Sequence, residues 1–278
     1  MTTPSIGLAL GGGSARGLAH IPMLEVFDEL GLRPKVIAGC SIGSLLGAAY
    51  AGGMSALDIR ERAQMLLANR VSAMRYAFGK KKLNPLDLLA LKGLASLHVQ
   101  GEALVDLVMP DTLPDLIEDC PIPFKVIATD YDNMEERVIA SGPLKKAVAA
   151  SIAIPGVILG PEYDGNVYVD GGVTNPVPFD HVREGVDIVV AVDVTGRPRV
   201  SNGKRLSNME LAVGSMLILF NQVANLRRAL SPPDIYIRPA IETFSGTDFF
   251  RFKEVMEQAL PAKDQLKRAL EERIAALS

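Results

Sequence analysis

The chain has 278 residues, of which 48% are apolar and 22% charged, and its formal net charge is −3. This composition is typical of a folded globular protein and argues against a disordered chain. A single α/β domain can reach this length. The small net charge, the 5% aromatic content and the absence of tryptophan argue against a nucleic-acid-binding surface. We therefore expect one folded domain over residues 1–278 and no nucleic-acid partner.

Short apolar runs alternate with helical patterns along the chain, which is typical of a mostly parallel sheet covered by helices on both faces. Several of these runs are continuously apolar, as strands buried on both sides are. The predicted strands cover residues 6–10, 35–38, 124–129, 137–140, 167–169, 188–194 and 235–238. The expected fold class is α/β, a three-layer sandwich around a central mostly parallel sheet.

The first predicted helix follows the first strand. Apolar residues recur at helical spacing from Leu18 to Leu30, and Gly31 provides a stop. Pro22 has no backbone N–H to donate and fits this helix poorly. The helix is therefore expected to kink at Pro22 or to begin late.

A second helix is predicted from the capping-box pattern of Ser55 and Asp58, and it extends to about residue 68. Residues from about 69 to 121 are less regular and mix a basic run with short helices. We predict that this region, 69–121, is a cap or lid of the domain. The other predicted helices are 209–226 and 252–277, the latter interrupted at Pro261.

One apolar stretch, 36–54, is nearly long enough to span a membrane, but its five glycines and strand-like start favour a buried strand, turn and helix. For the helix 209–226 we favour core packing, and for the basic run 80–82 a solvated turn; peripheral contact with a membrane is the alternative for both. Cys40 and Cys120 lack the spacing of a metal site or disulfide framework. With no signal-peptide pattern at the N-terminus, we expect a cytoplasmic protein.

A nucleophile elbow is predicted between the second strand and the helix after it. The pattern G-x-S-x-G occurs there as Gly39-Cys40-Ser41-Ile42-Gly43. A sharp strand-to-helix turn would lift the Ser41 hydroxyl clear of the sheet, and Gly39 and Gly43 would let the backbones pass closely. The helix N-terminus beyond Ser41 also offers free amides to an oxyanion. The alternative is a glycine-rich junction that only packs tightly.

A glycine-rich loop, residues 11–17, joins the first strand to the first helix, where backbone amides can converge on an anion. A dinucleotide site would need an acidic residue after the second strand, and a P-loop would need a Gly-Lys-Ser/Thr ending; the chain has neither. The hydrolase interpretation is an oxyanion hole, and the plainest alternative is a turn without a ligand. The candidate oxyanion-hole residues are Gly11, Gly12, Gly13, Ser14 and Arg16.

Asp170 is the candidate base for Ser41. It ends the strand-like run 166–169, and Gly171 and Gly172 after it permit close backbone approach. An aspartate has an ordinary pKa of about 3.9, so this carboxylate needs burial to act as a useful base. The alternative is an aspartate that only shapes a turn.

Taken in this order, the motifs resemble those of the patatin-like phospholipase family, and most of all its bacterial members related to neuropathy target esterase. The resemblance covers about residues 6–194 and includes the glycine loop with Ala19-His20-Ile21, the elbow, Ala150-Ser151-Ile152-Ala153-Ile154-Pro155-Gly156, and Asp170-Gly171-Gly172.

This resemblance implies a patatin-like fold, a Ser41–Asp170 dyad, and an oxyanion hole that includes the amides of Gly12 and Gly13. It also implies no cofactor, no metal and a lipid or other acyl ester as substrate. One departure is Ser14, where many relatives have glycine. A residue with a Cβ atom is strained at positive φ, so the amides that point inward are left open.

The predicted function is therefore a serine acyl-ester hydrolase of phospholipase A or lysophospholipase type, acting in lipid catabolism. Three alternatives stay open: an esterase with a Ser-His-Asp triad using His181, a non-hydrolytic nucleotide- or acyl-binding module, and an inactive scaffold. Histidine is the usual base for serine, but a lone histidine such as His20, His98 or His181 more often packs or faces solvent. The sequence leaves the oligomeric state open.

Overall fold

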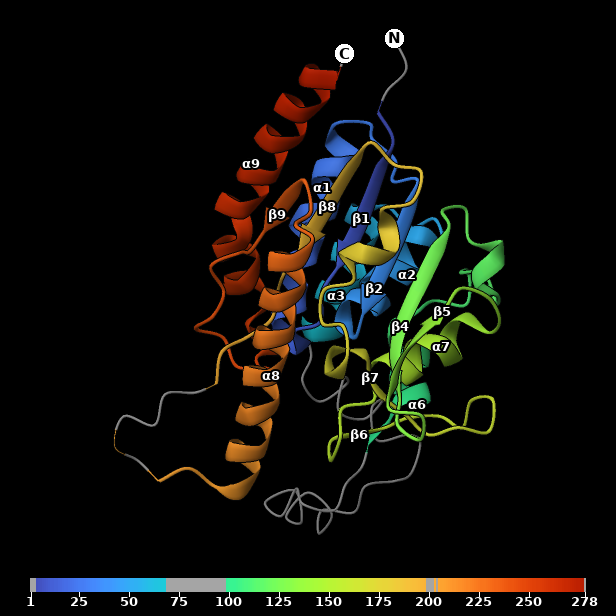
Figure 1. The fold of residues 1–278 in the computed structure, drawn as a ribbon, viewed down its shortest axis with the longest axis vertical. Coiled ribbons are helices and arrows are strands. Elements are labelled where there is room, and N and C mark those ends of the chain that lie inside the picture. The colour runs from blue at the N-terminus through green and yellow to red at the C-terminus, as the bar shows by residue number, and fades with distance from the viewer. Residues whose placement is uncertain (1–3, 69–98, 199–202, 204, 278) are drawn as a thin grey trace.

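The computed structural model describes residues 4–68, 99–198, 203 and 205–277. Its centre is a seven-stranded sheet in the order β5-β4-β2-β1-β8-β9, with β7 paired to β4 (Figure 1). Strands β1, β2, β4, β8 and β9 run parallel, whereas β5 and β7 are antiparallel to β4. The strands are β1 (Ile6–Leu10), β2 (Val36–Cys40), β4 (Phe124–Asp130), β5 (Glu135–Ile139), β7 (Tyr168–Asp170), β8 (Ile188–Val192) and β9 (Ile235–Ile237). The predicted α/β class and all seven predicted strands are confirmed.

Strand β4 aligns the ends of two other strands. Its first half pairs with β2, where Ile127 lies opposite Cys40, and its second half pairs with β7, where Ala128 lies opposite Asp170. Because β7 runs against β2, the two strands meet end to end along β4. The residue after Cys40 and the last residue of β7 are therefore brought together, although they are far apart in sequence.

Helices cover the two faces of the sheet unequally. The larger core cluster joins β1 side chains such as Leu8 to α1 (His20–Glu29), α2 (Ile42–Ala51), α7 (Leu144–Ser151) and α9 (Phe252–Leu277). Figure 1 shows α1 and α2 behind the sheet. The smaller cluster lies on the opposite face, where Ala9 and its neighbours pack against η5 (Phe179–Val182) and Ala224. This is the expected three-layer arrangement with one thin layer.

The first helix begins late, as Pro22 predicts. A 3₁₀ helix, η1 (Ser14–Ala19), takes up the first residues, and α1 starts at His20. Pro22 then lies in the first turn, where a backbone N–H has no partner within the helix. Gly31 follows the helix with φ of 63°, a conformation that suits glycine.

Helix α3 (Ala56–Ala68) has the predicted capping box: the Ser55 amide donates to Asp58 at 2.9 Å, and the Asp58 amide donates to the Ser55 hydroxyl at 3.1 Å. Of the predicted cap, 69–98 lies outside the described residues. The remainder contains β3 (Val99–Gln100), α6 (Gly101–Val108) and η3 (Ile117–Asp119), and β3 pairs with β6 (Ile158–Leu159). Neither short strand is predicted, because two residues show no periodicity.

The predicted interruption of the last helix is wrong, because α9 is continuous from Phe252 to Leu277 with Pro261 inside it. Pro261 is exposed, and so is Glu257, whose carbonyl loses its partner in the helix. Water can satisfy that carbonyl, while buried residues such as Leu266 continue the apolar face that packs on α1. The tertiary contact therefore outweighs the missing hydrogen bond.

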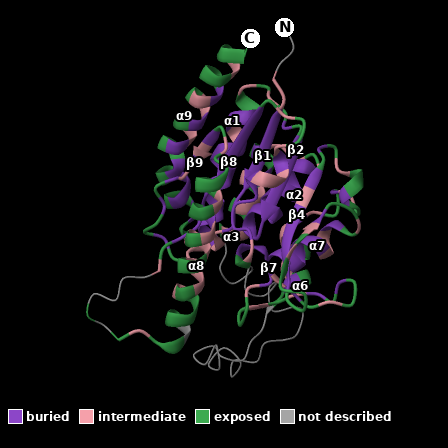
Figure 2. Cartoon of the chain, in the orientation of Figure 1, coloured by how far each residue is buried: buried purple, intermediate pink, exposed green. Residues whose placement is uncertain are grey.

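The predicted core packing of 209–226 is also wrong. Helix α8 (Asn208–Leu230) extends past both predicted ends, and among its described side chains only Ala224 is buried. Leu219, Leu226 and Leu230 are 61%, 63% and 77% exposed, and Figure 2 shows the exposed outer side of the helix. Ala224 packs in the smaller core cluster, and the other described side chains of α8 are at most partly buried, so α8 covers little of the sheet. Within the described residues, no helix is long and apolar enough to cross a membrane, and 36–54 forms β2, a turn and α2.

Candidate active site

Ser41 occupies a strained turn between β2 and α2. Its φ and ψ are 52° and −125°, a conformation that few residues with a side chain adopt. Two flanking glycines make the turn possible: a Cβ atom on Gly39 would lie 2.5 Å from the Cα of Ser44, and one on Gly43 would lie 2.1 Å from the Leu10 carbonyl oxygen. The sequence therefore folds here as the predicted elbow.

Hydrogen bonds from neighbouring segments hold this turn. The Ser41 amide donates to the Ser151 hydroxyl at 2.8 Å, and that hydroxyl donates to the Ile127 carbonyl at 2.5 Å. The Ser44 hydroxyl donates to the Ser41 carbonyl at 2.6 Å. This role of Ser151 was not predicted from the sequence, although Ser151 lies in the motif of residues 150–156. Its polar side chain in an otherwise apolar helix end, 147–153, is the signal that could have indicated this role.

The Ser41 hydroxyl donates to Oδ2 of Asp170 at 2.6 Å. The other carboxylate oxygen, Oδ1, accepts the Gly172 amide at 2.8 Å. Both side chains are buried, with Ser41 5% and Asp170 3% exposed. A Cβ atom on Gly171 would lie 2.2 Å from the Ile127 carbonyl oxygen, so glycine is required where the chain leaves β7.

Burial makes Asp170 a stronger base than a solvated aspartate. It raises the pKa of Asp170 from 3.8 to about 6, because the charged form is poorly solvated, while the hydrogen bonds from Ser41 and Gly172 oppose the rise. At neutral pH the group is mostly ionised and still accepts a proton readily. The arrangement can remove a proton from the Ser41 hydroxyl.

The histidines of the described residues do not bond to Ser41. His181 lies in an ion-pair network, with Nε2 2.6 Å from Glu136, and this hydrogen bond raises the pKa of His181. Arg227 bridges Glu136 at 2.8 Å and Asp180 at 2.7 Å. These carboxylates and His181 have the composition of a metal site, but the Arg227 guanidinium already forms an ion pair with each of the two carboxylates. The network ties α8 to β5 and η5.

The glycine loop passes beside Ser41: a Cβ atom on Gly12 would lie 3.2 Å from the Cβ atom of Ser41. The amides of Gly11 and Gly12 are engaged, donating at 2.9 Å to the carbonyls of Val192 and Pro176, respectively. The next two amides, those of Gly13 and Ser14, have no hydrogen-bond partner within the described part of the chain. Ser14 has φ of 51°, so it adopts the strained conformation despite its Cβ atom.

The Arg16 side chain serves a different contact. Its guanidinium is buried, donates to the Phe244 carbonyl at 2.8 Å, and lies where a Cβ atom on Gly196 would be 1.9 Å from its Cζ atom. Of the five candidate oxyanion-hole residues, Gly13 and Ser14 therefore offer free amides. The Gly11 and Gly12 amides and the Arg16 side chain are used by the fold itself.

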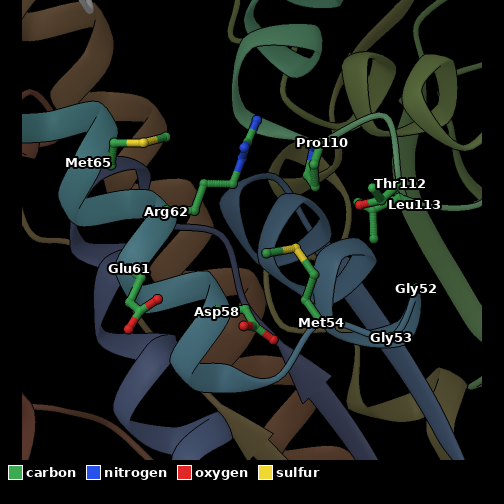
Figure 3. A pocket seen from close by; sticks show the side chains of 10 residues that line it. All are labelled: Gly52, Gly53, Met54, Asp58, Glu61, Arg62, Met65, Pro110, Thr112 and Leu113. Carbon is green, nitrogen blue, oxygen red and sulfur yellow. The ribbon is translucent and has the colours of Figure 1, made fainter.

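A pocket of about 690 Å³ lies apart from these residues, between the end of α2, helix α3 and the segment after α6 (Figure 3). Figure 3 shows Met54 and Met65 on its wall, with Arg62 reaching toward Pro110. Arg62 is bound to the Leu107 carbonyl at 3.2 Å and to that of Val108. Ser41 and Asp170 are not among its lining residues, so the pocket does not belong to the site.

The chain is similar to known proteins over most of its length. The family model described as patatin-like phospholipase matches residues 8–183. A patatin-like phospholipase domain-containing protein of Caenorhabditis elegans is 32% identical over 94% of this chain and 20% of its own length. An NTE family protein of Mycobacterium tuberculosis is 34% identical over 70% of this chain and 50% of its own length. A lysophospholipase of Aspergillus niger is 27% identical over 91% of this chain and 17% of its own length. The chain thus spans half or less of the length of each relative.

Proposed function

Because the chain belongs to the patatin-like phospholipase family of carboxylic ester hydrolases, as its motifs predict, we propose that it hydrolyses acyl esters of lipids through Ser41 and Asp170. The observation that carries this proposal is the 2.6 Å hydrogen bond from the Ser41 hydroxyl to a carboxylate that is 3% exposed. A strained elbow, an adjacent base and free amides are the parts that acyl transfer requires.

The proposed reaction has two steps. The Ser41 oxygen attacks the ester carbonyl carbon while Asp170 takes the hydroxyl proton, and the amides of Gly13 and Ser14 stabilise the oxyanion. The tetrahedral intermediate collapses to an acyl-enzyme, and Asp170 returns the proton to the leaving alcohol. Water then attacks the acyl carbonyl carbon while Asp170 takes its proton, and Asp170 gives that proton to the Ser41 oxygen as the bond to the acyl group breaks and the fatty acid leaves.

We propose a phospholipid or lysophospholipid as the substrate class, in a role in lipid catabolism. A relative named as a lysophospholipase aligns with 91% of this chain, which favours a lysophospholipid over a phospholipid as the substrate. The test is mass spectrometry of a cell lipid extract incubated with wild type or with Ser41→Ala. Loss of lysophospholipids with release of fatty acids by wild type alone would support the proposal. An unchanged lipid profile together with no labelling of Ser41 by a fluorophosphonate would contradict it and favour a non-hydrolytic module.

We further propose that the protein acts in the cytoplasm and touches the inner membrane surface through α8. Leu211, Ile218 and Leu226 follow one face of this helix and are 52%, 49% and 63% exposed. The helix also adjoins the site, because a Cβ atom on Gly172 would lie 2.9 Å from the Phe220 ring. The free thiols of the chain fit a reducing compartment.

Flotation with phosphatidylglycerol vesicles tests this contact. Wild type should float with the vesicles, and Leu226→Glu should float less while hydrolysing a soluble ester normally. The matched control is Leu260→Glu, which alters an exposed leucine of α9 (46% exposed) and should leave flotation unchanged. Equal flotation of all three proteins, or none by wild type, would contradict the contact.

A further inference from the structure

Two hydrogen bonds hold the peptide group that joins Gly11 to Gly12. The Gly12 amide donates to the Pro176 carbonyl at 2.9 Å, and Nε2 of His20 lies 2.8 Å from the Gly11 carbonyl oxygen. The C=O and N–H of a trans peptide point in opposite directions, so this peptide plane is held at both ends. It is the plane immediately before the free amide of Gly13.

His20 is a fully enclosed and neutral side chain. It is 0% exposed at the start of α1, and burial lowers its pKa to about 4. A carbonyl oxygen only accepts hydrogen bonds, so the proton of the neutral ring must be on Nε2. The other ring nitrogen, Nδ1, is buried with no partner in the described residues.

An imidazole is an unfavourable choice for this position if it serves packing alone. A buried acceptor without a partner destabilises a fold, and an apolar side chain of similar size would avoid that loss. Neighbours on the same helix, Ile21 and Leu24, are apolar and equally buried. The bond to the Gly11 carbonyl is therefore the polar contact that distinguishes His20 from its neighbours.

We propose that His20 is a positioning residue for the oxyanion hole: its Nε2–H holds the Gly11 carbonyl so that the amides of Gly13 and Ser14 face the ester bound at Ser41. This inference rests on the proposed function. Glycines on both sides of the peptide plane allow it to rotate when it is not held. Loss of the His20 hydrogen bond would reduce the stabilisation of the transition state more than the affinity for substrate, because the amides act on negative charge that develops during the reaction.

The experiment compares side chains that keep or lose a donor at the Nε2 position. His20→Gln can place an amide N–H close to the position of Nε2, whereas the shorter His20→Asn cannot, and His20→Leu has no donor. The control is Leu24→Ala, which perturbs the same buried helix face without a bond to the loop. The measurements are kcat and KM on a p-nitrophenyl ester, with active sites counted by fluorophosphonate titration.

We expect His20→Leu and His20→Asn to lower kcat per titrated site by about 10- to 100-fold, with KM changed by less than about threefold. His20→Gln should restore most of kcat. Leu24→Ala should lower Tm while its kcat per titrated site stays at the wild-type value. A loss of titratable sites with unchanged kcat per site is the signature of a structural role alone.

Two results overturn the inference by itself: wild-type kcat per site in His20→Leu, or an equal loss in His20→Gln and His20→Asn. If His20→Leu does not fold, the comparison of kcat per titrated site between His20→Gln and His20→Asn tests the inference, because these two side chains differ in the position of the N–H donor. A wild type whose hydrolysis does not depend on Ser41 overturns the proposed function and this inference with it. The two failures are therefore distinguishable.

Discussion

Replacing Asp170 with asparagine is expected to stabilise the folded protein at neutral pH. Burial raises the pKa of Asp170 from 3.8 to about 6, so the folded state holds the proton more tightly than the unfolded state. The stability that this group contributes is full below pH 3.8 and is lost as the pH rises through about 6. The two pKa values differ by about two pH units, and each unit corresponds to about 1.36 kcal/mol. At pH 8 the ionised carboxylate therefore destabilises the folded protein by about 3 kcal/mol relative to the protonated group.

Asparagine has the same shape and no charge, so Asp170→Asn should remove this penalty. Its oxygen can accept the Gly172 amide, and its amide nitrogen can face the Ser41 hydroxyl oxygen. The expected gain is about 3 kcal/mol at pH 8, or about 5 °C in Tm for a chain of this length. At pH 5 the gain should fall to about half, because the wild-type folded state is then mostly protonated.

Differential scanning calorimetry at pH 5 and pH 8 measures this effect. The matched control is Asp130→Asn, because the pKa of Asp130 is lowered by hydrogen bonds from Asn133, and removal of its charge should lower Tm at pH 8. At pH 8 the same substitution should therefore raise Tm at position 170 and lower it at position 130. A lower Tm for Asp170→Asn at pH 8, or an equal gain in Tm at both pH values, would contradict a destabilising charge on Asp170.

Three further predictions concern turnover and the elbow. The rate constant kcat/KM should rise with pH and level off above about 6, because Asp170 must be ionised to accept a proton; a flat profile from pH 5 to 8 would count against it. Ser151→Ala removes the acceptor of the Ser41 amide, so urea unfolding should show a loss of about 1–3 kcal/mol and ester assays a lower kcat; unchanged values would contradict the contact. Gly43→Ala should unfold at much lower urea than Gly47→Ala, since their added Cβ atoms would lie 2.1 Å from a backbone oxygen and 3.0 Å from a ring edge, respectively; equal midpoints would contradict this.

Local patterns were enough to predict most of the fold. Continuous apolar runs indicated the strands, and the G-x-S-x-G pattern indicated the elbow. The two glycines of the pattern are required because a Cβ atom at either position would clash with nearby backbone atoms. The exceptions depend on tertiary packing. Pro261 is accommodated because its face of α9 is exposed. Helix α8 is exposed because Ala224 is its one fully buried side chain among the described residues, and that side chain packs in the smaller core cluster.

The site was predictable in its residues but not in its geometry. Ser41 and Asp170 meet because β2 and β7 end at adjacent positions along β4, a register that no sequence spacing reveals. The amides of Gly11 and Gly12 bond to carbonyls of distant segments, so the resemblance to a family could not tell which loop amides are free. Such long-range backbone contacts depend on the assembled sheet rather than on local sequence.

The most direct test of the Ser41–Asp170 dyad compares Ser41→Ala, Asp170→Asn and His181→Ala in the hydrolysis of a short-chain p-nitrophenyl ester. Ser41→Ala and Asp170→Asn should abolish turnover, whereas His181→Ala should keep most of it, because His181 is bound to Glu136 and not to Ser41. Substantial turnover by Asp170→Asn, or its loss in a folded His181→Ala, would contradict the Ser41–Asp170 dyad.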